Sequence, residues 1–434
     1  MDIKRLILVA IGVITLSLFY FPVTFSAFPV ANSKNLMAAV GLVVAVVEFV
    51  RNRTSGINKD LLNISILAIL VSLMGFYSVS YNGTPDYAYA SYIVSFIIWS
   101  CSAYFALFVI KKVEGRLSVN IVINYLILLC VLQCVSVLLI DTYPAVKNWV
   151  LRTFNDFSDI ERIERLYGIG PWLDVAGTRF ASVLVMIAYM LTREKILKNS
   201  KTISLYILAF LFILIVGSMV GRTTSVGGGI ALIYLLWHNR DTLLSHQNRK
   251  FIGLFFLIVA VGISLSVYYY NNNMAFRENV RFAFEGFFNW WETGVWSTTS
   301  TNRWQTMFVW PESMKTWLIG DGYFDGPSDI DPYYTGPPNS GFYKWTDIGY
   351  LRFIFYFGTI GLLLFAAYFV KVAFTCMSRF KASRTMFAIL LFLNFVIWFK
   401  VSTDIYLVFA LFLYITKEEN DEYERLSAAK EQAQ

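Results

Sequence analysis

Four arginines stand where a membrane protein could bind phosphate groups. Arg179, Arg222 and Arg352 lie at or near the ends of apolar segments, and Arg303 precedes an apolar stretch of a long polar loop. A charge at the membrane surface is costly unless paired, so such residues mark candidate sites. Guanidinium groups bind phosphate oxygens bidentately, and two or three together would hold a diphosphate. Taken singly, each arginine could equally well contact a lipid headgroup or form a structural ion pair. Arg222 is the strongest candidate for a phosphate-binding residue, because the turn 217–222 is short and apolar.

Carboxylates are the expected acid–base groups, because the chain has only two histidines, His238 and His246, and both fall on the side opposite to these arginines. Asp347 follows an aromatic, Pro/Gly-rich loop and opens a long apolar segment. Burial there would raise its pKa, and nearby Arg352 would lower it again. Asp347 could also simply cap the helix that follows. Asp174, in the stretch WLDVAGTR, is the second candidate.

The remaining acidic and thiol groups indicate no metal site or cofactor. The four aspartates of the long loop lack the spacing of a calcium-binding loop, so they are interpreted as loop solvation. The four cysteines lie in apolar segments without metal-ligand spacing, which favours a packing role. These residues are Asp321, Asp325, Asp329 and Asp331, and Cys101, Cys130, Cys134 and Cys376.

The composition predicts an all-α polytopic membrane protein. Of the 434 residues 57% are hydrophobic and only 15% charged, against about 25% charged in soluble domains. A span needs about 20 apolar residues, and such segments recur along the chain. We predict about 12 transmembrane helices, near 6–22, 36–50, 61–80, 91–110, 119–140, 180–192, 203–216, 223–238, 251–270, 348–370, 385–399 and 403–416.

Basic residues concentrate in the connections on the side of the termini, which predicts that both the N- and the C-terminus are cytoplasmic. We expect a single transmembrane domain, 1–416, and a helical cytoplasmic tail, 417–434. Two large loops, 141–177 and 271–347, face outward. The alternating charges around Arg162 predict a solvated helix in the first loop. In the second, apolar residues at helical spacing over 276–291 predict an amphipathic interfacial helix whose Trp side chains anchor it or stack on sugars.

Three local patterns resemble the bacterial O-antigen polymerase family (Wzy) and its relatives, the O-antigen ligases. GSMVGRTTSVGGG is similar to the family's Ser-Arg-Thr turn and places Arg222 at its arginine. TNRWQTMFVWPESMKTWLIGDGYF resembles its arginine, tryptophan and Gly-x-Gly pattern, with Arg303, Gly320 and Gly322 at those positions. TDIGYLRFIFYFGTIGLLLF resembles the segment after the loop, with Asp347 near the histidine of ligases. The absence of that histidine favours a polymerase.

The resemblance implies a glycosyltransferase of GT-C architecture in the bacterial inner membrane, with its active site facing the periplasm. The implied reaction transfers a growing glycan from undecaprenyl diphosphate to a lipid-linked repeat unit, with inversion and without a metal or other cofactor. Partners would be these lipid-linked oligosaccharides, the bilayer and a chain-length regulator, with no nucleic acid. The implied residues are Asp347 and Arg222 for catalysis, Arg179, Arg222, Arg303 and Arg352 for the diphosphate, and Asp174, Arg281, Trp304 and Tyr350 for the rest of the substrate.

Three other functions remain open. A flippase or transporter for lipid-linked oligosaccharides also has about twelve spans, but usually has short loops, paired halves and charges at mid-bilayer. An O-antigen ligase shares the chemistry and differs in the acceptor. A structural membrane scaffold would have no use for the polar, aromatic outer loop.

Overall fold

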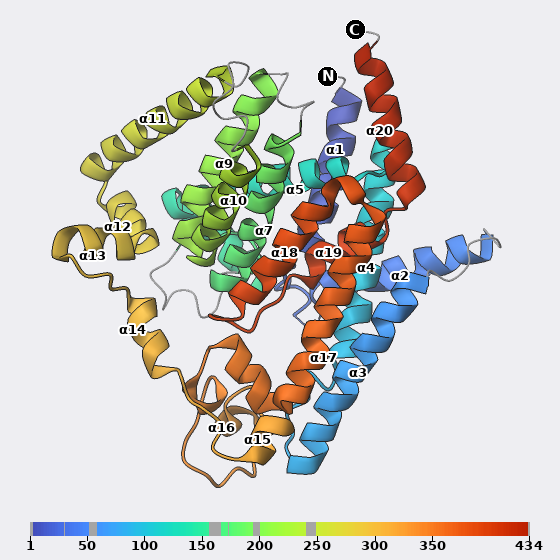
Figure 1. Cartoon of the computed structure of the whole chain (residues 1–434), viewed down its shortest axis with the longest axis vertical. Coiled ribbons are helices and arrows are strands. Elements are labelled where there is room, and N and C mark those ends of the chain that lie inside the picture. Colours follow the sequence, from blue (N-terminus) through green and yellow to red (C-terminus); the bar gives the residue numbers. More distant parts are fainter. Residues whose placement is uncertain are drawn as a thin grey trace. The chain divides into compact units, whose positions relative to one another are not determined.

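The computed structural model describes residues 3–29, 31–51, 59–155, 166–171, 173–193, 200–239 and 249–432. Within these ranges the chain is helical and forms only isolated β-bridges, which confirms the predicted all-α class (Figure 1). In the part of the chain that the structure describes, eight helices are long and apolar enough to cross a membrane, in agreement with a polytopic membrane protein. They are α1 (Ile3–Tyr20), α2 (Ser33–Arg51), α3 (Lys59–Asn82), α4 (Tyr92–Glu114), α5 (Val119–Thr142), α7 (Leu173–Leu191), α9 (Ser200–Val220) and α17 (Gly349–Arg379).

The other four predicted spans correspond to helices that are not among these eight. Two correspond to α10 (Thr223–Asn239) and α11 (Arg249–Asn272), and two to the shorter α18 (Arg384–Ile397) and α19 (Tyr406–Leu413). A helix rises about 1.5 Å per residue, so the 8 residues of α19 cannot alone cross a core about 30 Å thick. The count of twelve spans therefore stays a prediction.

The chain forms two compact units. Unit 1 comprises residues 1–40, 102–296 and 414–434, and unit 2 comprises 41–101 and 297–413. Unit 1 also holds α6 (Pro144–Thr153), α12 (Met274–Ala283), α13 (Glu285–Thr293) and α20 (Lys417–Gln432). Unit 2 also holds α14 (Thr299–Thr306), α15 (Met314–Leu318), α16 (Pro327–Ile330), and the short 3-10 helices η4 (Tyr343–Trp345) and η5 (Lys381–Ser383).

Helix α7 is the core of unit 1. Every residue from Ala176 to Leu191 is buried, and α5, α9 and α10 pack against this helix. Small residues allow the close approach of α10: a Cβ at Gly227 would overlap Ala181 of α7, and one at Gly228 would overlap Leu214 of α9. These two glycines therefore serve the close packing of α10 against α7 and α9.

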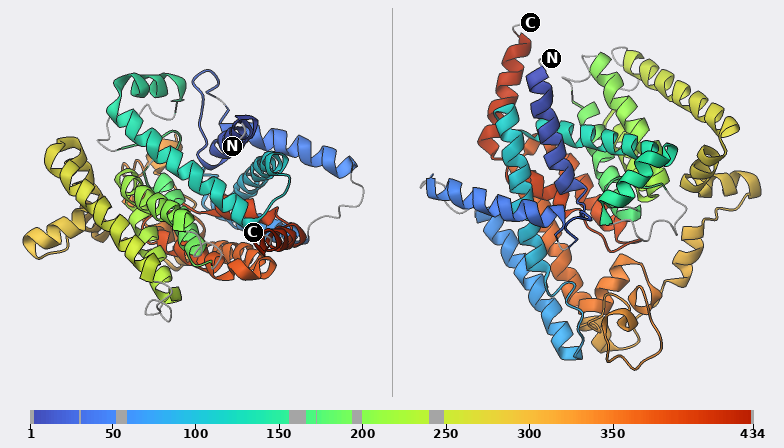
Figure 2. Two further views of the ribbon diagram at one scale, coloured as in Figure 1. Left: turned by 90° about the horizontal axis from the view of Figure 1, so that it is seen from above. Right: turned by 180° about the vertical axis from the view of Figure 1, so that it is seen from behind.

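The C-terminal tail is helical, as predicted, and α20 docks on unit 1. Arg193 donates to both carboxylate oxygens of Glu424 at 2.8 Å, Lys111 pairs with Glu419, and the side-chain oxygen of Asn420 accepts from the backbone N–H of Val119 at 3.0 Å. The end of α20 and the start of α1 lie at the same end of unit 1 (Figures 1 and 2).

The two predicted loops contain helices of their own. The first contains α6, whereas the predicted charged helix around Arg162 lies outside the described residues. In the second, the expected amphipathic helix is present but divided into α12 and α13 by Phe284, which has the non-helical angles φ −117° and ψ 28°. The side chain of Asn273 caps α12 by accepting from the N–H of Phe276 at 2.9 Å.

Unit 2 is organised around a break in α17. Phe357 and Gly358 leave the helical conformation, and Gly358 has φ 71°. Carbonyl groups before the break accept hydrogen bonds from the turn around Asp321: its N–H donates to the Phe355 carbonyl at 2.6 Å, and that of Gly322 to Tyr356 at 3.2 Å. The turn replaces hydrogen bonds that the broken helix cannot make internally.

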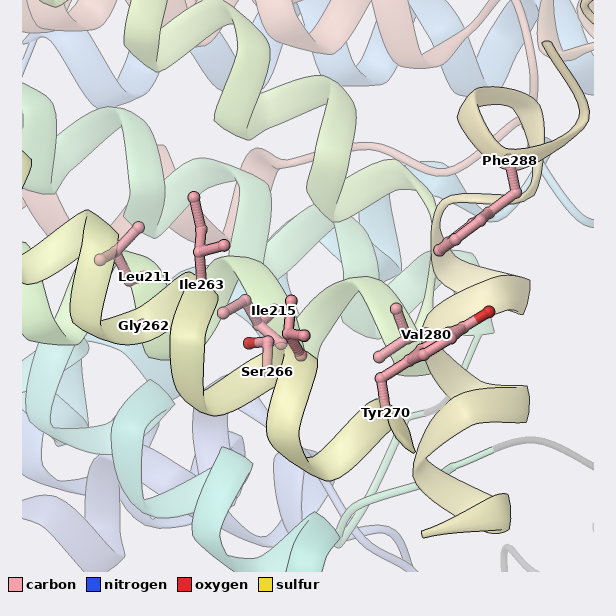
Figure 3. A pocket seen from close by; sticks show the side chains of 9 residues that line it. Leu211, Ile215, Gly262, Ile263, Ser266, Tyr270, Val280 and Phe288 are labelled. Atoms are coloured by element: carbon pink, nitrogen blue, oxygen red, sulfur yellow. The ribbon is translucent and has the colours of Figure 1, made fainter. Parts of the chain in front are cut away.

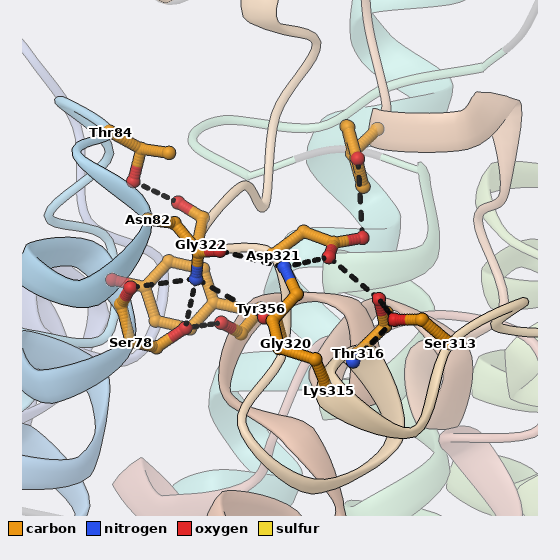
Figure 4. A network of polar contacts seen from close by, with 11 residues as sticks. Ser78, Asn82, Thr84, Ser313, Lys315, Thr316, Gly320, Asp321, Gly322 and Tyr356 are labelled. Atoms are coloured by element: carbon orange, nitrogen blue, oxygen red, sulfur yellow. Dashed lines mark hydrogen bonds and ion pairs between the residues drawn. The ribbon is translucent and has the colours of Figure 1, made fainter.

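Side chains from α3 and α15 fix this turn in place (Figure 4). Ser78 donates to the Tyr356 carbonyl at 2.6 Å and Asn82 donates to the Gly320 carbonyl at 3.1 Å. The Lys315 ammonium donates to Asn82 and to Asp321, both at 2.7 Å. A cation, an amide and a carboxylate thus connect α3, α15 and the broken α17.

Replacing Gly358 by alanine should destabilise the protein. Its positive φ disfavours any side chain, and a Cβ would overlap the Leu318 carbonyl. We expect a loss of about 1–3 kcal/mol in the free energy of unfolding, measured as a lower melting temperature in detergent. Gly229→Ala in α10 is the matched control, because nothing lies within 4 Å of its Cβ. Equal melting temperatures for both variants would contradict the role assigned to the break.

Candidate functional site

Arg222 lies in the turn between α9 and α10. The turn is shorter than the predicted 217–222, because residues 217–220 still belong to α9. Gly221 permits the turn because a Cβ there would overlap the Leu173 carbonyl of α7. The Thr224 hydroxyl donates to the Gly217 carbonyl at 2.9 Å and closes the end of α9. Arg222 therefore precedes the first residue of α10, where the helix dipole favours negative charge.

The guanidinium of Arg222 holds a carboxylate. Its Nη2 lies 2.6 Å from Oε2 of Glu285, and the two side chains are only 15% and 25% exposed. The Phe282 ring covers the guanidinium, with its centre 4.2 Å from Cζ. Glu285 and Phe282 come from α13 and α12, so the segment predicted to lie in the headgroup region covers this arginine.

Asp174 positions the start of α10. It lies in the first turn of α7, and its Oδ1 accepts a hydrogen bond from the Thr223 hydroxyl at 2.5 Å. Thr223 is the residue next to Arg222, so Asp174 acts on the arginine through the backbone of the turn.

Arg179 is buried in unit 1, with 4% of its surface exposed. Its Cζ lies 6.0 Å from the ring centre of Tyr20 and 5.7 Å from that of Phe21. The Tyr20 hydroxyl donates to the Arg179 carbonyl at 3.2 Å. Arg179 follows Gly177 by two residues, and Gly177 packs against Gly221 of the turn. The structure thus places Arg179 in the part of α7 that runs past the Arg222 turn.

Arg281 lies on α12 and is more exposed. It donates to Glu292 at 2.7 Å and to the Tyr270 hydroxyl at 3.2 Å. The hydrogen bond to the Glu292 carboxylate raises the pKa of Arg281. Both side chains of this pair are more than 40% exposed, so water competes with the contact.

Arg352 forms a closed cluster in unit 2. The side chain is 5% exposed, and its Cζ lies 3.5 Å from the ring centre of Phe324 and 4.3 Å from that of Phe342. It donates to Asp325 and to Ser402, both at 2.8 Å. These contacts indicate that Arg352 connects the outer loop to α17, with little room for a phosphate.

Three aspartates of unit 2 have roles that the sequence did not show. Asp325 was expected to solvate its loop, but it pairs with Arg352; burial raises the pKa of Asp325, and the arginine opposes that shift. Asp86, 6% exposed, accepts from the N–H groups of Phe324 at 2.6 Å and Asp325 at 3.1 Å. Asp331 likewise accepts a hydrogen bond, from Tyr323 at 2.7 Å.

Asp347 precedes α17 and is half-buried. The cap position belongs to Ile348, without a side-chain hydrogen bond, so the capping role expected for Asp347 is not seen. Asp347 lies close enough to Arg352 to interact with its charge. The Tyr350 hydroxyl donates to the Phe395 carbonyl at 3.0 Å, which ties the first turn of α17 to α18.

Arg303 and Trp304 lie on α14 in unit 2. Arg303 is exposed. The Trp304 indole donates to the Phe399 carbonyl at 2.9 Å, and its ring lies 4.5 Å from that of Phe308. Trp304 is 37% exposed, so part of its surface is accessible for a ligand.

The predicted site residues therefore form two groups. Asp174, Arg179, Arg222 and Arg281 belong to unit 1, and Arg303, Trp304, Asp347, Tyr350 and Arg352 to unit 2. Sequence reasoning placed Glu285 only within the amphipathic interfacial segment 276–291 and missed its pairing with Arg222, because an ion pair between distant segments leaves no spacing signal.

No protein-family model, no curated protein and no solved structure matches this chain. The functional argument therefore rests on the residues and their contacts.

Replacing Arg352 by glutamine should destabilise unit 2. The change leaves the Asp325 carboxylate without its cation, and water compensates part of the loss because Asp325 is half-exposed. We expect a loss of about 2 kcal/mol, measured by thermal unfolding and by faster proteolysis of the outer loop. Arg303→Gln, a change of the exposed arginine on α14, should stay within about 0.5 kcal/mol. An Arg352→Gln protein as stable and protease-resistant as the parent would refute the structural role.

Proposed function

We propose that this chain is a polysaccharide polymerase that transfers a growing glycan from a polyprenyl diphosphate to a lipid-linked repeat unit. The observation that carries the proposal is the Arg222–Glu285 pair. An arginine at the start of a helix, in a bundle of membrane-length helices, holds an anion in a largely buried place.

Glu285 shows what kind of ligand this place accepts. A carboxylate and a phosphate both offer anionic acceptor oxygens, and arginine binds both bidentately. The N-terminus of α10 adds a favourable dipole for an anion. A diphosphate that displaced Glu285 would exchange one anionic partner of Arg222 for another, so the arginine would keep a counter-charge, and the released Glu285 carboxylate would need solvent.

The reaction needs stabilisation of a departing diphosphate. The bond between the anomeric carbon and the phosphate oxygen breaks, and its electron pair leaves with the diphosphate. The acceptor hydroxyl forms the new glycosidic bond on the opposite face and gives its proton to a base. In unit 1, Arg222 would stabilise the leaving charge, with Arg179 as a further cation. For Arg303 and Asp347 of unit 2, the family resemblance alone implies the roles of a further cation and of the base.

The proposed topology has twelve spans of a GT-C transferase, both termini in the cytoplasm and the site on the periplasmic side of the bacterial inner membrane. Basic connections on the terminal side support this orientation. The two ends of the chain lie at the same end of unit 1, as an even number of spans requires (Figure 1). The substrate would be undecaprenyl-diphosphate-linked oligosaccharide, and a chain-length regulator would act with the enzyme.

Two alternatives have distinct products. Loss of an O-antigen ligase leads to accumulation of carrier-linked polymer. Loss of a polymerase leads to accumulation of single-repeat products. A flippase would move lipid-linked oligosaccharide between leaflets without lengthening it. Incubation of purified protein with a lipid-linked repeat unit, followed by gel analysis for a ladder, separates these functions.

Arg222→Ala should abolish long polymer. The variant loses the cation that the proposed site requires, and removal of such a transition-state contact costs about 10²–10³ in rate. Protein in the membrane should stay at the parental level. Arg152→Ala, which changes an exposed arginine on α6, is the control and should give a normal ladder. A normal ladder from Arg222→Ala would remove this arginine from the site.

Asp347→Asn should reduce the transfer rate by about 10²–10⁴ if this carboxylate takes the acceptor proton. The amide keeps the shape but cannot accept a proton, so turnover should fall while membrane abundance stays constant. Glu312→Gln, at an exposed carboxylate of the same unit, should leave turnover unchanged. Turnover by Asp347→Asn within twofold of the parent would assign the base to another residue.

A further inference from the structure

An apolar groove of about 430 Å³ opens on unit 1 between α9, α11, α12 and α13 (Figure 3). Ile263 and Val267 of α11 are 59% and 53% exposed, so the groove is open along the side of the helices. Its other lining side chains are almost entirely hydrocarbon and include Leu211 and Ile215 of α9, Val280 of α12 and Phe288 of α13.

Two guanidinium groups contact the aromatic side chains at one end of the groove. Tyr270 and Phe288 both line it. Arg281 donates to the Tyr270 hydroxyl at 3.2 Å, and its Cζ lies 5.1 Å from the Phe288 ring centre. Arg277 donates to the Tyr270 carbonyl at 2.9 Å, and its Cζ lies 5.4 Å from the Tyr270 ring centre. The apolar lining of the groove thus ends at two positive charges, those of Arg277 and Arg281, which form the charged lip of the groove.

We propose that this groove binds one acyl chain of an anionic phospholipid and that Arg281 and Arg277 hold the lipid phosphate. The groove matches the chain in polarity, and the lip matches the headgroup in charge. Arg281 currently pairs with Glu292, but their side chains are 42% and 44% exposed. Such an exposed pair contributes little, so a phosphate can take the place of Glu292.

The size of the groove favours a phospholipid over the polyprenyl carrier. Its volume is near the lower end of the range for small-molecule sites, which suits one acyl chain and is too small for a long polyprenol. Helix α12 is amphipathic and carries both arginines on one side, the arrangement by which helices bind anionic lipid surfaces.

The bound lipid would also support the cover over Arg222. Val280 lines the groove, whereas Phe282, two residues on, covers the Arg222 guanidinium. In α13, Phe288 lines the groove and Glu285, one turn earlier, pairs with Arg222. The same two short helices therefore form a wall of the groove and the lid of the arginine. The lipid site stands apart from the proposed transferase activity, because binding alone tests it.

Binding is measured by native mass spectrometry of the purified full chain in detergent. Phosphatidylglycerol and phosphatidylcholine with identical acyl chains are compared. We expect about tenfold tighter binding of phosphatidylglycerol. Gly262→Leu fills the groove, where a Cβ meets only Leu211 at 4.0 Å, and should abolish binding of both lipids at this site. Gly253→Leu, on the same helix and outside the groove lining, is the control and should bind as the parent.

The double variant Arg277→Gln/Arg281→Gln should bind phosphatidylglycerol no better than phosphatidylcholine, whereas Arg152→Gln keeps the tenfold preference. Ser266→Phe is a second groove-filling change, used if Gly262→Leu does not fold. Equal binding of both lipids by the parent, or parental binding by a folded groove-filling variant, would overturn the proposal. Displacement of phosphatidylglycerol by an equimolar polyprenyl phosphate would assign the groove to the carrier lipid and overturn it as well.

Discussion

Polar groups within the apolar helices must find their partners inside the protein, and the break in α17 shows this constraint most clearly. At Phe357 and Gly358 the helix loses its regular hydrogen bonding. The carbonyls of Phe355 and Tyr356 are then satisfied by a turn of the outer loop. Hydrocarbon offers no replacement for these bonds, so the loop and the helix depend on each other, and the outer segment is an integral part of unit 2.

The same constraint explains how the arginines are placed. Arg352 is enclosed by two aromatic rings and a carboxylate, and every contact ties one part of unit 2 to another. Arg222 is covered by one ring and one carboxylate, both from the short helices α12 and α13. The Arg352 side chain is 5% exposed and that of Arg222 is 15% exposed, so a ligand has better access to Arg222. This difference in surroundings separates a structural arginine from a candidate binding arginine, which residue type alone could not do.

Hydropathy and helical spacing predicted the all-α class, the eight long helices and the position of the amphipathic segment. These features are local, because each depends on a run of neighbouring residues. Within the predicted last span, 403–416, the helix α19 covers only Tyr406–Leu413, and all of its residues are buried. An apolar run shows that a segment avoids water, without showing whether lipid or protein surrounds it.

The candidate site was predictable only in part. Arg222 could be selected because its turn is short and apolar, and the structure places Arg222 in a turn, although residues 217–220 belong to α9. Its partner Glu285 and the Arg352 partner Asp325 could not be predicted, because both pairs join segments far apart in the chain. The sequence pattern assigned Asp325 to a solvated loop, where most such residues lie, and Glu285 to the amphipathic interfacial segment. Only the packing of α13 over the α9–α10 turn, and of the outer loop over α17, turns them into partners of buried cations.

The amphipathic segment is divided at Phe284 into α12 and α13, and these two helices both cover Arg222 and line the apolar groove. A single straight helix would present one apolar side along its whole length. Two short helices can turn separate faces to separate neighbours, so Val280 and Phe288 meet the groove while Phe282 and Glu285 meet Arg222. Any ligand that moves this cover, whether a phosphate at the arginine or a chain in the groove, must act on both places at once. Helices α12 and α13 therefore connect the groove to the surroundings of Arg222.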